Sequence, residues 1–485
     1  MKKSIIFIFI IVFLTDFAPV CSQHGEDRYV PDPDPLLQKK LEKWQDLKFG
    51  LLMHWGPYCQ WGIVESWSIC AEDEPWCRRN MDDYEAYKKA YENLKTTFNP
   101  IEFNPEKWAK AAKDAGMRYM IFTTKHHDGF TMYDTKLTDY KVTDTECPFH
   151  TNPKADVTRE IFNAFRAEGL WVGPYFSKPD WHSPYYWWPN FATPDRNVNY
   201  SIDKYPDRWE KFKEFTHGQI LELVTNYGPV DILWLDGGQV QPVSNEQKIR
   251  MLNSPNYKFS RIENQDINMD ELVEKVREKQ PGIIVVDRAV YGKNQNYLTP
   301  ENRVPEKSLP YPWESCIIAG GGWSWVPDAK YMSIRDGIHL LVDIVAKGGN
   351  LLLNIAPGPM GQWHQDAYDL LGGFGAWMKV NQAAIYETRA IAPYKEANIC
   401  LTKKEDGKVY AIYLAGEDEN TMPSFLTMNT ISPQKKASII LVGTNTELSW
   451  EKSGNGFIAE IPERLRKNPP SKYAWAFEIS AIEEN

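Results

Sequence analysis

Two histidines and an aspartate stand side by side in the stretch 122–134, directly after an apolar run. Side chains of the types of His126, His127 and Asp128 can bind a metal ion, relay protons to a nucleophile, or form hydrogen bonds with a ligand. Neighbouring strand residues point to opposite faces, so the two imidazoles start out on different sides of an extended chain. This disfavours a shared metal ion and a relay. It favours contacts with different groups of one ligand, with Asp128 orienting the histidines or the turn.

Carboxyl groups that follow buried strands suggest a second kind of chemistry. Hydrolysis of a glycosidic bond requires two carboxyl groups that flank the bond. Asp236 is the strongest candidate, because it ends the apolar run of VDILWLDGG (230–238) and two glycines follow it, where the backbone can turn. A carboxylate that emerges from a buried strand is costly without a role, although it could also cap the next helix. For the second carboxyl group, both Glu301 on a polar loop and Glu314 near a strand remain open.

Seven short apolar runs are expected to form the strands that position these residues. Continuous apolar runs are typical of strands buried on both faces. The runs are 48–55, 118–129, 170–181, 230–238, 282–288, 312–317 and 348–358. Amphipathic helix patterns precede five of them, so strands and helices alternate as in a parallel α/β fold. The first run lacks the glycine fingerprint of a doubly wound sheet, which favours a (β/α)8-like (TIM) barrel with its site at the carboxyl ends of the strands.

The chain is expected to divide into three parts. Residues 1–21 combine a basic start, an apolar run and small residues, which is typical of a secretory signal peptide, and Cys21 could carry a lipid. The protein is therefore expected to be exported, as a periplasmic, cell-surface lipoprotein or secreted protein. Residues 36–390 should form the barrel. Residues 391–485 contain short alternating strands with glycine turns, which predicts an antiparallel β-sandwich.

Charge and composition limit the classes of partner. A net charge of −10 argues against nucleic acid and anionic membranes, and no segment beyond the signal is long enough to span a membrane. Aromatic residues make up 13% of the chain and can present flat apolar faces to sugars. Six cysteines beyond Cys21 could pair after export, with Cys70 and Cys77 close enough to bridge. The chain has no CxxC pair, which disfavours a structural zinc site.

Five motifs together resemble the α-L-fucosidases of glycoside hydrolase family 29. They are KFGLLMHWG (48–56), ESW (65–67), TKHHDGF (124–130), WLDG (234–237) and KGGNLLLNI (347–355). Each motif is weak alone, but the ordered set is specific and spans residues 40 to 390. The C-terminal part is similar only in its general pattern.

The resemblance implies an exo-acting, retaining enzyme that releases terminal α-L-fucose from an oligosaccharide or glycoconjugate through a covalent fucosyl-enzyme intermediate, without a metal or another cofactor. The family's nucleophile falls on Asp236. Its acid/base falls on Glu301 or Glu314, and Glu301 is favoured. Its sugar contacts fall on His54, Trp67, His126, His127, Tyr175, Arg288 and, in the same aromatic wall, Trp325.

The residue types agree with a site for fucose, which presents three hydroxyls and one methyl group. Histidines and an arginine can donate to hydroxyls, and tryptophans can form a wall for the methyl group. Four rival hypotheses remain: a related exo-glycosidase for another sugar, an inverting hydrolase, a metal-dependent hydrolase, and a non-catalytic carbohydrate-binding barrel. The loops 72–91 and 179–205, rich in aromatic residues and proline, are expected to shape the aglycone side.

Overall fold

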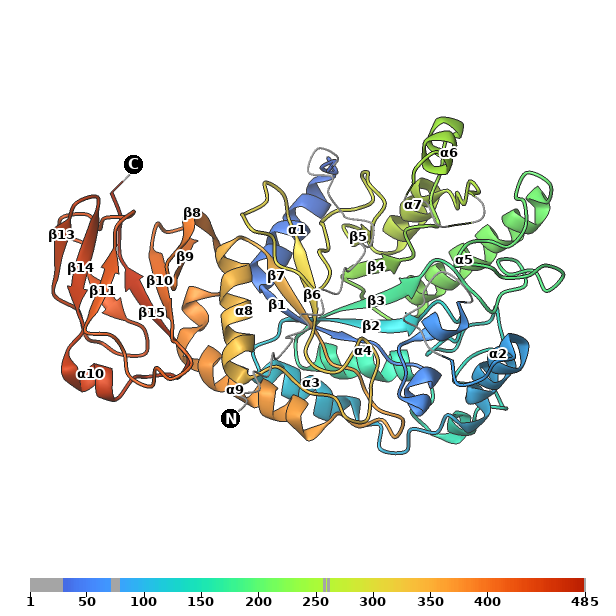
Figure 1. The fold of residues 1–485 in the computed structure, drawn as a ribbon, viewed down its shortest axis with the longest axis horizontal. Coiled ribbons are helices and arrows are strands. Elements are labelled where there is room, and N and C mark those ends of the chain that lie inside the picture. The colour runs from blue at the N-terminus through green and yellow to red at the C-terminus, as the bar shows by residue number, and fades with distance from the viewer. Residues whose placement is uncertain (1–28, 71–78, 256–258, 260–261, 484–485) are drawn as a thin grey trace, which may run out of the picture.

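The computed structural model describes residues 29–70, 79–255, 259 and 262–483 (Figure 1). The expected signal segment 1–21, including Cys21, lies outside these residues, and so does Cys77. Within the described ranges, no helix is both long and apolar enough to cross a membrane.

A curled sheet of seven parallel strands forms the centre of the larger domain, in the order β5-β4-β3-β2-β1-β7-β6. The strands are β1 (Phe49–Met53), β2 (Tyr119–Lys125), β3 (Trp171–Ser177), β4 (Ile232–Asp236), β5 (Ile284–Asp287), β6 (Glu314–Ile318) and β7 (Asn350–Asn354). Nearly all of their residues are buried, as the continuous apolar runs predict. The expected TIM-like barrel is confirmed, with seven regular strands.

The segment 294–302 fills the gap between β5 and β6. On one side the Asn296 N–H donates to the Val285 carbonyl (2.9 Å), and on the other the Glu314 N–H donates to the Leu298 carbonyl (2.8 Å). The segment makes only isolated bridges with its neighbours. It contains a proline, which cannot donate to a sheet ladder, so the segment closes the cylinder without becoming a regular strand.

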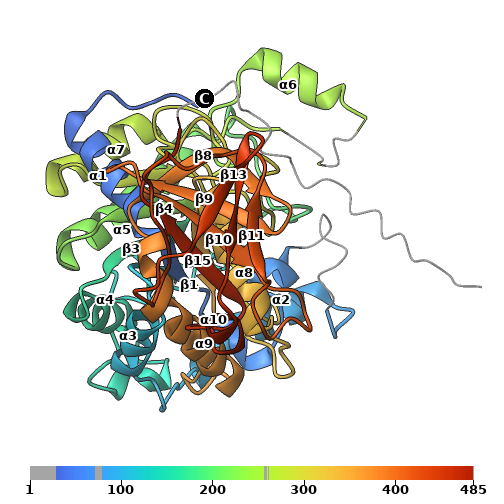
Figure 2. The ribbon, with the colours of Figure 1, turned by 90° about the vertical axis from the view of Figure 1, so that its left-hand side faces the viewer.

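Helices surround this sheet (Figures 1 and 2). They are α1 (Pro35–Leu47), α2 (Tyr84–Glu92), α3 (Pro105–Asp114), α4 (Val157–Ala167), α5 (Pro206–Asn226), α6 (Asn245–Leu252), α7 (Met269–Lys279), α8 (Ile334–Ala346) and α9 (Gln365–Asn381). Short 3-10 helices are η2 (Pro57–Trp61), η3 (Ser66–Ile69), η4 (Asn93–Thr97), η5 (Pro148–Thr151) and η6 (Gln382–Ala384). Side-chain caps begin several of the α-helices; Asp156, for example, accepts from the Arg159 N–H and starts α4.

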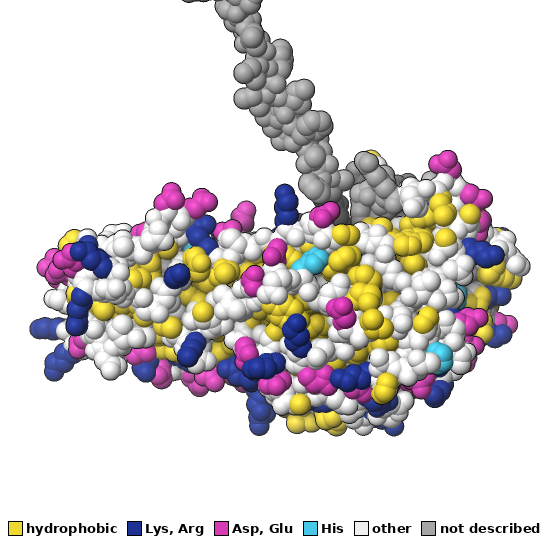
Figure 3. All heavy atoms as spheres, turned by 90° about the horizontal axis from the view of Figure 1, so that it is seen from below, with side chains coloured by type: hydrophobic (Ala, Val, Ile, Leu, Met, Phe, Trp, Pro, Cys, Tyr) yellow, Lys and Arg dark blue, Asp and Glu magenta, His cyan; other side chains and the backbone are white. Residues whose placement is uncertain are grey.

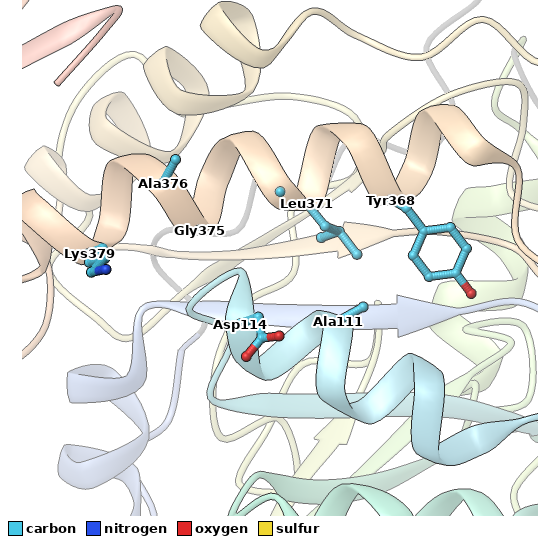
Figure 4. A pocket seen from close by; sticks show the side chains of 8 residues that line it. Ala111, Asp114, Tyr368, Leu371, Gly375, Ala376 and Lys379 are labelled. Carbon is cyan, nitrogen blue, oxygen red and sulfur yellow. The ribbon is translucent and has the colours of Figure 1, made fainter.

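Helices α3 and α9 pack side by side and leave a groove of about 410 Å³ on the surface (Figure 4). Ala111 of α3 and Ala376 of α9 are among the small residues that line it. A Cβ atom at Gly375 would lie 2.4 Å from the Asp114 carbonyl oxygen, so glycine allows the two backbones to approach closely. The groove is thus a product of tight helix packing.

The C-terminal part consists of two antiparallel sheets, which confirms the expected β domain. The first has the order β12-β15-β10-β9-β8 and the second β11-β14-β13. Their bounds are β8 (Thr388–Glu396), β9 (Ile399–Lys404), β10 (Val409–Leu414), β11 (Phe425–Met428), β12 (Ile439–Leu441), β13 (Trp450–Ser453), β14 (Gly456–Glu460) and β15 (Ala474–Ile479), with a short helix α10 (Glu463–Lys467).

Strand β15 shows how this domain is attached to the barrel. Trp475 and Phe477 join the core between the two sheets, whereas Ala474 and Ala476 face the core that includes α8 and α9. The Trp377 indole N–H of α9 also donates to the Ala474 carbonyl (2.9 Å). The five-stranded sheet is therefore buried on both faces, and Figure 2 shows it lying across the end of the barrel domain.

Four cysteines that could have formed disulfides after export are free thiols. Cys59, Cys147, Cys316 and Cys400 are buried and unbridged. Burial raises the pKa of the Cys147 thiol to about 11, so this group is a neutral part of the core at neutral pH. On the face seen in Figure 3, basic and acidic side chains are interspersed with hydrophobic ones.

Candidate active site

Polar side chains from several strands meet at the carboxyl end of the barrel. Asp236 is the last residue of β4, and Tyr175 lies on the neighbouring β3. His54 follows β1, His126 follows β2, and Arg288 follows β5. Because all the strands are parallel, their carboxyl ends open at one end of the barrel, where TIM-like enzymes have their sites.

Asp236 is held as an ionised carboxylate by its surroundings. The Tyr175 hydroxyl donates to its Oδ2 (2.7 Å), the Gly237 N–H donates to its Oδ1 (2.8 Å), and Arg288 Nη1 lies 3.3 Å from Oδ1. Burial alone would raise the pKa of this carboxyl group. The Arg288 charge, the nearby His127 and the hydrogen bonds outweigh burial and hold the pKa well below its usual range.

The turn after Asp236 requires glycine. Gly237 has a φ of +91°, and a Cβ atom there would lie 2.1 Å from Pro179 Cδ. The close approach of this proline shapes the wall next to the carboxylate.

Arg288 connects the second carboxyl group to the first. Its Nη2 is hydrogen-bonded to Glu301 Oε2, while its Nη1 contacts Asp236. The Trp323 indole N–H donates to Glu301 Oε1 (3.1 Å). The Glu301 side chain is 36% exposed and that of Asp236 is 19% exposed, so Glu301 lies on the solvent side of the pair. One guanidinium contacts both groups, so the two carboxyl groups are close together.

Glu314 lies elsewhere, in the interior of the barrel. It begins β6, whereas Asp236 ends β4. The Tyr119 hydroxyl donates to its Oε2 (2.6 Å), and the Trp234 indole N–H donates to its Oε1 (3.3 Å). Trp234 is two residues before Asp236, so Glu314 lies deeper in the barrel, near the layer of Trp234. Burial raises the pKa of Glu314 to about 7. The structure therefore separates the two glutamates that the sequence left as alternatives.

The three histidines are neutral and have different partners. His54 Nδ1 donates to Asn354 Oδ1 (3.0 Å), and His126 Nδ1 is bonded to Ser66 Oγ. Burial lowers the pKa of His54 and of His127 to about 4, and it also lowers the pKa of His126 well below its usual value. Each ring can thus donate from one nitrogen and accept at the other.

His127 and two other buried groups beside Asp236 leave polar atoms available. Among the described residues, His127 Nδ1, Arg288 Nε and Glu65 Oε1 have no hydrogen-bond partner. Burial raises the pKa of Glu65 to about 8, so this carboxyl group is protonated at neutral pH. Buried polar atoms are rarely left unpaired in a folded protein, so a water molecule or a polar ligand can supply the missing partner of these atoms.

Asp128 supports the turn after β2 and does not bond the histidines. It accepts from the Tyr91 hydroxyl (2.7 Å) and from the Phe130 N–H (3.2 Å). Burial raises its pKa to about 7. In the part of the chain that the structure describes, no group of three His, Cys, Asp or Glu side chains could hold a metal ion.

Aromatic rings form the walls. The Trp67 ring stands edge-on to that of His127 at 5.0 Å, and the ring of Trp323 lies 5.2 Å from that of His54. Trp325, the aromatic residue expected here, instead packs against His364 at 5.1 Å. Trp323 therefore contacts His54, and a sugar contact by Trp325 stays a prediction.

Sequence reasoning missed three residues of this cluster, namely Glu65, Trp323 and Asn354. Asn354 is the last residue of β7, so the rule that strand ends carry the site would have found it. Glu65 lies in a motif that was noted for its tryptophan, and Trp323 is on a loop, where the sequence offers no periodic signal.

A parallel barrel with two carboxyl groups at its carboxyl end, among neutral donors and aromatic rings, defines a glycoside hydrolase. Residues 17–383 match the alpha-L-fucosidase family, and residues 394–480 match the alpha-L-fucosidase C-terminal domain. The chain belongs to the alpha-L-fucosidase family, and the resemblance seen in the sequence is confirmed.

Similar proteins extend over nearly the whole chain. The plasma alpha-L-fucosidase of Pongo abelii is 27% identical over 490 residues, covering 95% of each chain. The structure of alpha-L-fucosidase isoenzyme 1 from Paenibacillus thiaminolyticus is 28% identical, with a TM-score of 0.70, and the match covers 93% of this chain and all of that one. The GH29 alpha-L-fucosidase of Bacteroides thetaiotaomicron, solved as a trapped covalent intermediate with 2-fluoro-fucosyl fluoride, is 21% identical with a TM-score of 0.70, and the match covers 94% of this chain and 98% of that one.

Proposed function

We propose that this enzyme is an exo-acting, retaining α-L-fucosidase in which Asp236 is the nucleophile and Glu301 the acid/base. The observation that carries the proposal is that one guanidinium, that of Arg288, contacts both carboxyl groups. Retaining enzymes need their two carboxyl groups only about 5–5.5 Å apart, and a shared arginine keeps such a pair close.

The reaction proceeds in two displacements. Asp236 attacks C1 of the fucosyl residue, the bond from C1 to the leaving oxygen breaks, and Glu301 gives its proton to that oxygen. Glu301, now a carboxylate, then takes a proton from water. The water oxygen attacks C1 and releases Asp236 as a carboxylate. The low pKa of Asp236 keeps the nucleophile ionised, and the exposed position of Glu301 gives its proton access to the leaving group and to water.

Three neutral imidazoles and one cationic guanidinium around Asp236 are suited to a terminal fucose. His54, His126, His127 and Arg288 can bond its hydroxyls, and the unpaired Nδ1 of His127 supports such a contact. The rings of Trp67 and Trp323 supply apolar walls for the methyl group. The substrate is accordingly a fucosylated oligosaccharide or glycoconjugate.

Trapping and chemical rescue test these roles. The intact protein treated with 2-fluoro-fucosyl fluoride should gain the mass of one fluorofucosyl group on Asp236, and Asp236→Ala should gain none. Azide should restore turnover of an activated aryl α-L-fucoside by Glu301→Ala and release fucosyl azide. If azide instead restores Glu314→Ala, the assignment of the acid/base is wrong, and labelling at another residue would refute the nucleophile.

We also propose that the protein is exported, as the basic start and apolar run of residues 1–21 indicate. Mass spectrometry of the mature N-terminus would test this. A free new N-terminus near Cys21 would indicate a secreted or periplasmic protein, a lipid on Cys21 would indicate a lipoprotein, and an intact N-terminus would refute export.

A further inference from the structure

We propose a second, non-catalytic carbohydrate site in a cavity of about 290 Å³ between helix α2 and the loop 182–193, which binds one neutral sugar ring. Ligand pockets usually measure about 300–1,000 Å³, so this cavity is suited to one monosaccharide ring, and further units of a glycan would extend outside it.

The cavity lies at the same end of the barrel as Asp236. Helix α2 belongs to the connection that follows β1, and the loop follows β3, so both leave the carboxyl ends of strands. Figure 1 shows α2 beyond that end of the sheet. A glycan bound by Asp236 therefore extends from the same end of the molecule.

A layer of stacked indoles separates the cavity from the catalytic pocket. The Trp181 ring lies 4.9 Å from that of His127 on one side and stacks on that of Trp187 at 5.1 Å on the other. Trp181 is fully buried and Trp187 is 2% exposed. Trp187 lines the cavity, so the two sites lie on opposite sides of this wall and a ligand can fill one without filling the other.

Aromatic side chains give the cavity an apolar surface. Phe191 is 41% exposed, although large aromatic side chains are usually covered in a folded protein, and half-buried Trp188 stands edge-on to it at 5.3 Å. Sugar rings carry C–H groups on one face and pack these against aromatic rings.

Charged groups of helix α2, together with His182, also line the cavity and can bond hydroxyls. Lys88 lies 5.1 Å above the Trp187 ring and 4.0 Å from Glu92, which in turn is 3.2 Å from His182 Nδ1. Burial raises the pKa of Glu92, but His182 and Lys88 outweigh this and lower it, so its carboxylate remains an acceptor. Glu85 adds a second carboxylate. The lysine can donate to a hydroxyl and the carboxylates can accept.

The balance of charge selects among sugars. Two carboxylates and one ammonium line the cavity, which disfavours an anionic sugar by repulsion and desolvation. A neutral hexose or N-acetylhexosamine fits the lining. Such a ring can belong to the substrate itself, at a position several sugar units away from the fucose. It can also belong to a separate glycan chain.

The test measures sugar binding by the full-length enzyme while L-fucose fills the catalytic pocket. A neutral disaccharide of hexose and N-acetylhexosamine, without fucose, is titrated by calorimetry in saturating L-fucose. We expect saturable binding that L-fucose does not displace and that Phe191→Ala weakens by about tenfold or more. Phe425→Ala is the matched control, since Phe425 is 53% exposed on β11 of the C-terminal domain. This variant should bind the disaccharide as the wild type does.

Three results would overturn the proposal: no saturable binding, displacement by L-fucose, or equal affinity of the wild type and Phe191→Ala. Binding of a sialylated sugar as tight as that of the neutral one would overturn the predicted sugar class. None of these measurements depends on turnover, so they stand apart from the roles of Asp236 and Glu301.

Kinetics distinguish the two sources of the sugar. An aryl α-L-fucoside cannot reach the cavity, so its kcat and KM should be unchanged in Phe191→Ala. If the ring belongs to the substrate, KM for a fucosylated oligosaccharide rises in this variant. If it belongs to a separate chain, KM stays unchanged while disaccharide binding is lost. Both outcomes support a second site and assign its occupant.

Discussion

Arg288 Nη1 lies 3.3 Å from Oδ1 of Asp236, and the other terminal nitrogen of the same guanidinium is bonded to Glu301. A planar guanidinium can hold two carboxyl groups in fixed positions, which a lysine ammonium cannot do. The arginine therefore lowers the pKa of Asp236 and also fixes the position of the second carboxyl group relative to it.

Arg288→Lys should lower kcat/KM by about 10²-fold, because the ammonium keeps the charge but cannot bond both carboxyl groups. Steady-state kinetics with an aryl α-L-fucoside measure the loss. Arg389→Lys is the control. Arg389 pairs with Asp46, which precedes β1 and so lies toward the amino end of the barrel, opposite the cluster, and the kinetics of this variant should be those of the wild type. Activity of Arg288→Lys within a factor of two of the wild type would contradict the bridging role.

On the acid side, kcat/KM should fall with a midpoint near pH 4. Burial lowers the pKa of His54 and His127 to about 4, so both rings are neutral above that pH and become cations below it. The pKa of Asp236 is lower still, so its protonation does not set this midpoint. Enzyme held at pH 4 and assayed at pH 7 should recover full activity, which excludes unfolding. If kcat/KM instead falls with a midpoint near pH 6.5, the histidines titrate as exposed residues do and the prediction is wrong.

Glu314→Gln should change stability more than catalysis. In the folded protein Glu314 keeps its proton up to about pH 7, whereas in the unfolded chain it loses the proton near 4.5. The folded state therefore binds more protons over this range, and the free energy of unfolding contributed by this group falls as pH rises from 4.5 to 7.

Thermal unfolding of wild type and Glu314→Gln at pH 5 and pH 8 measures this contribution. The neutral glutamine cannot ionise, so the variant should gain stability relative to wild type at the higher pH. Its kcat should stay within about tenfold of the wild type, because Glu314 is hydrogen-bonded to Trp234 and Tyr119 in the barrel interior and lies away from the carboxyl pair. A loss of 10³-fold or more would return Glu314 to the list of acid/base candidates.

Gly237→Ala should reduce both stability and activity, because the new Cβ would clash with Pro179 beside the nucleophile. We expect a destabilisation of about 1–3 kcal/mol or more and a fall in kcat. Gly407→Ala is a matched control with the same φ of +91° but with nothing within 4 Å of the added atom. If both variants behave alike, backbone strain alone explains the effect and the proline contact is unimportant.

Dialysis against EDTA should leave kcat/KM unchanged. The charges that the proposed reaction requires are carried by side chains, and Nδ1 of His54 and of His126 is already engaged by Asn354 and Ser66. Zinc added back after dialysis serves as the control. Loss of activity on chelation, with recovery on adding zinc, would favour a metal-dependent hydrolase.

The sequence by itself determined the architecture and the position of most strand ends. Buried parallel strands appear as continuous apolar runs, and their carboxyl ends meet whatever the side-chain packing, so His54, Asp236 and Arg288 could be placed together in advance. The motifs also indicated the family, since their order along the chain is independent of the tertiary structure.

Only the tertiary structure placed Glu301 beside Arg288, Glu314 in the interior of the barrel, and Trp323 against His54. A residue near a strand can lie at its start or its end, and β6 begins at Glu314, which places this carboxyl group inside the barrel. Glu301 lies near the end of the irregular segment 294–302, which closes the cylinder between β5 and β6, and the isolated bridges of this segment leave no periodic pattern in the sequence. The long-range contacts of Arg288 and Trp323, made across loops, are what bring Glu301 to Asp236.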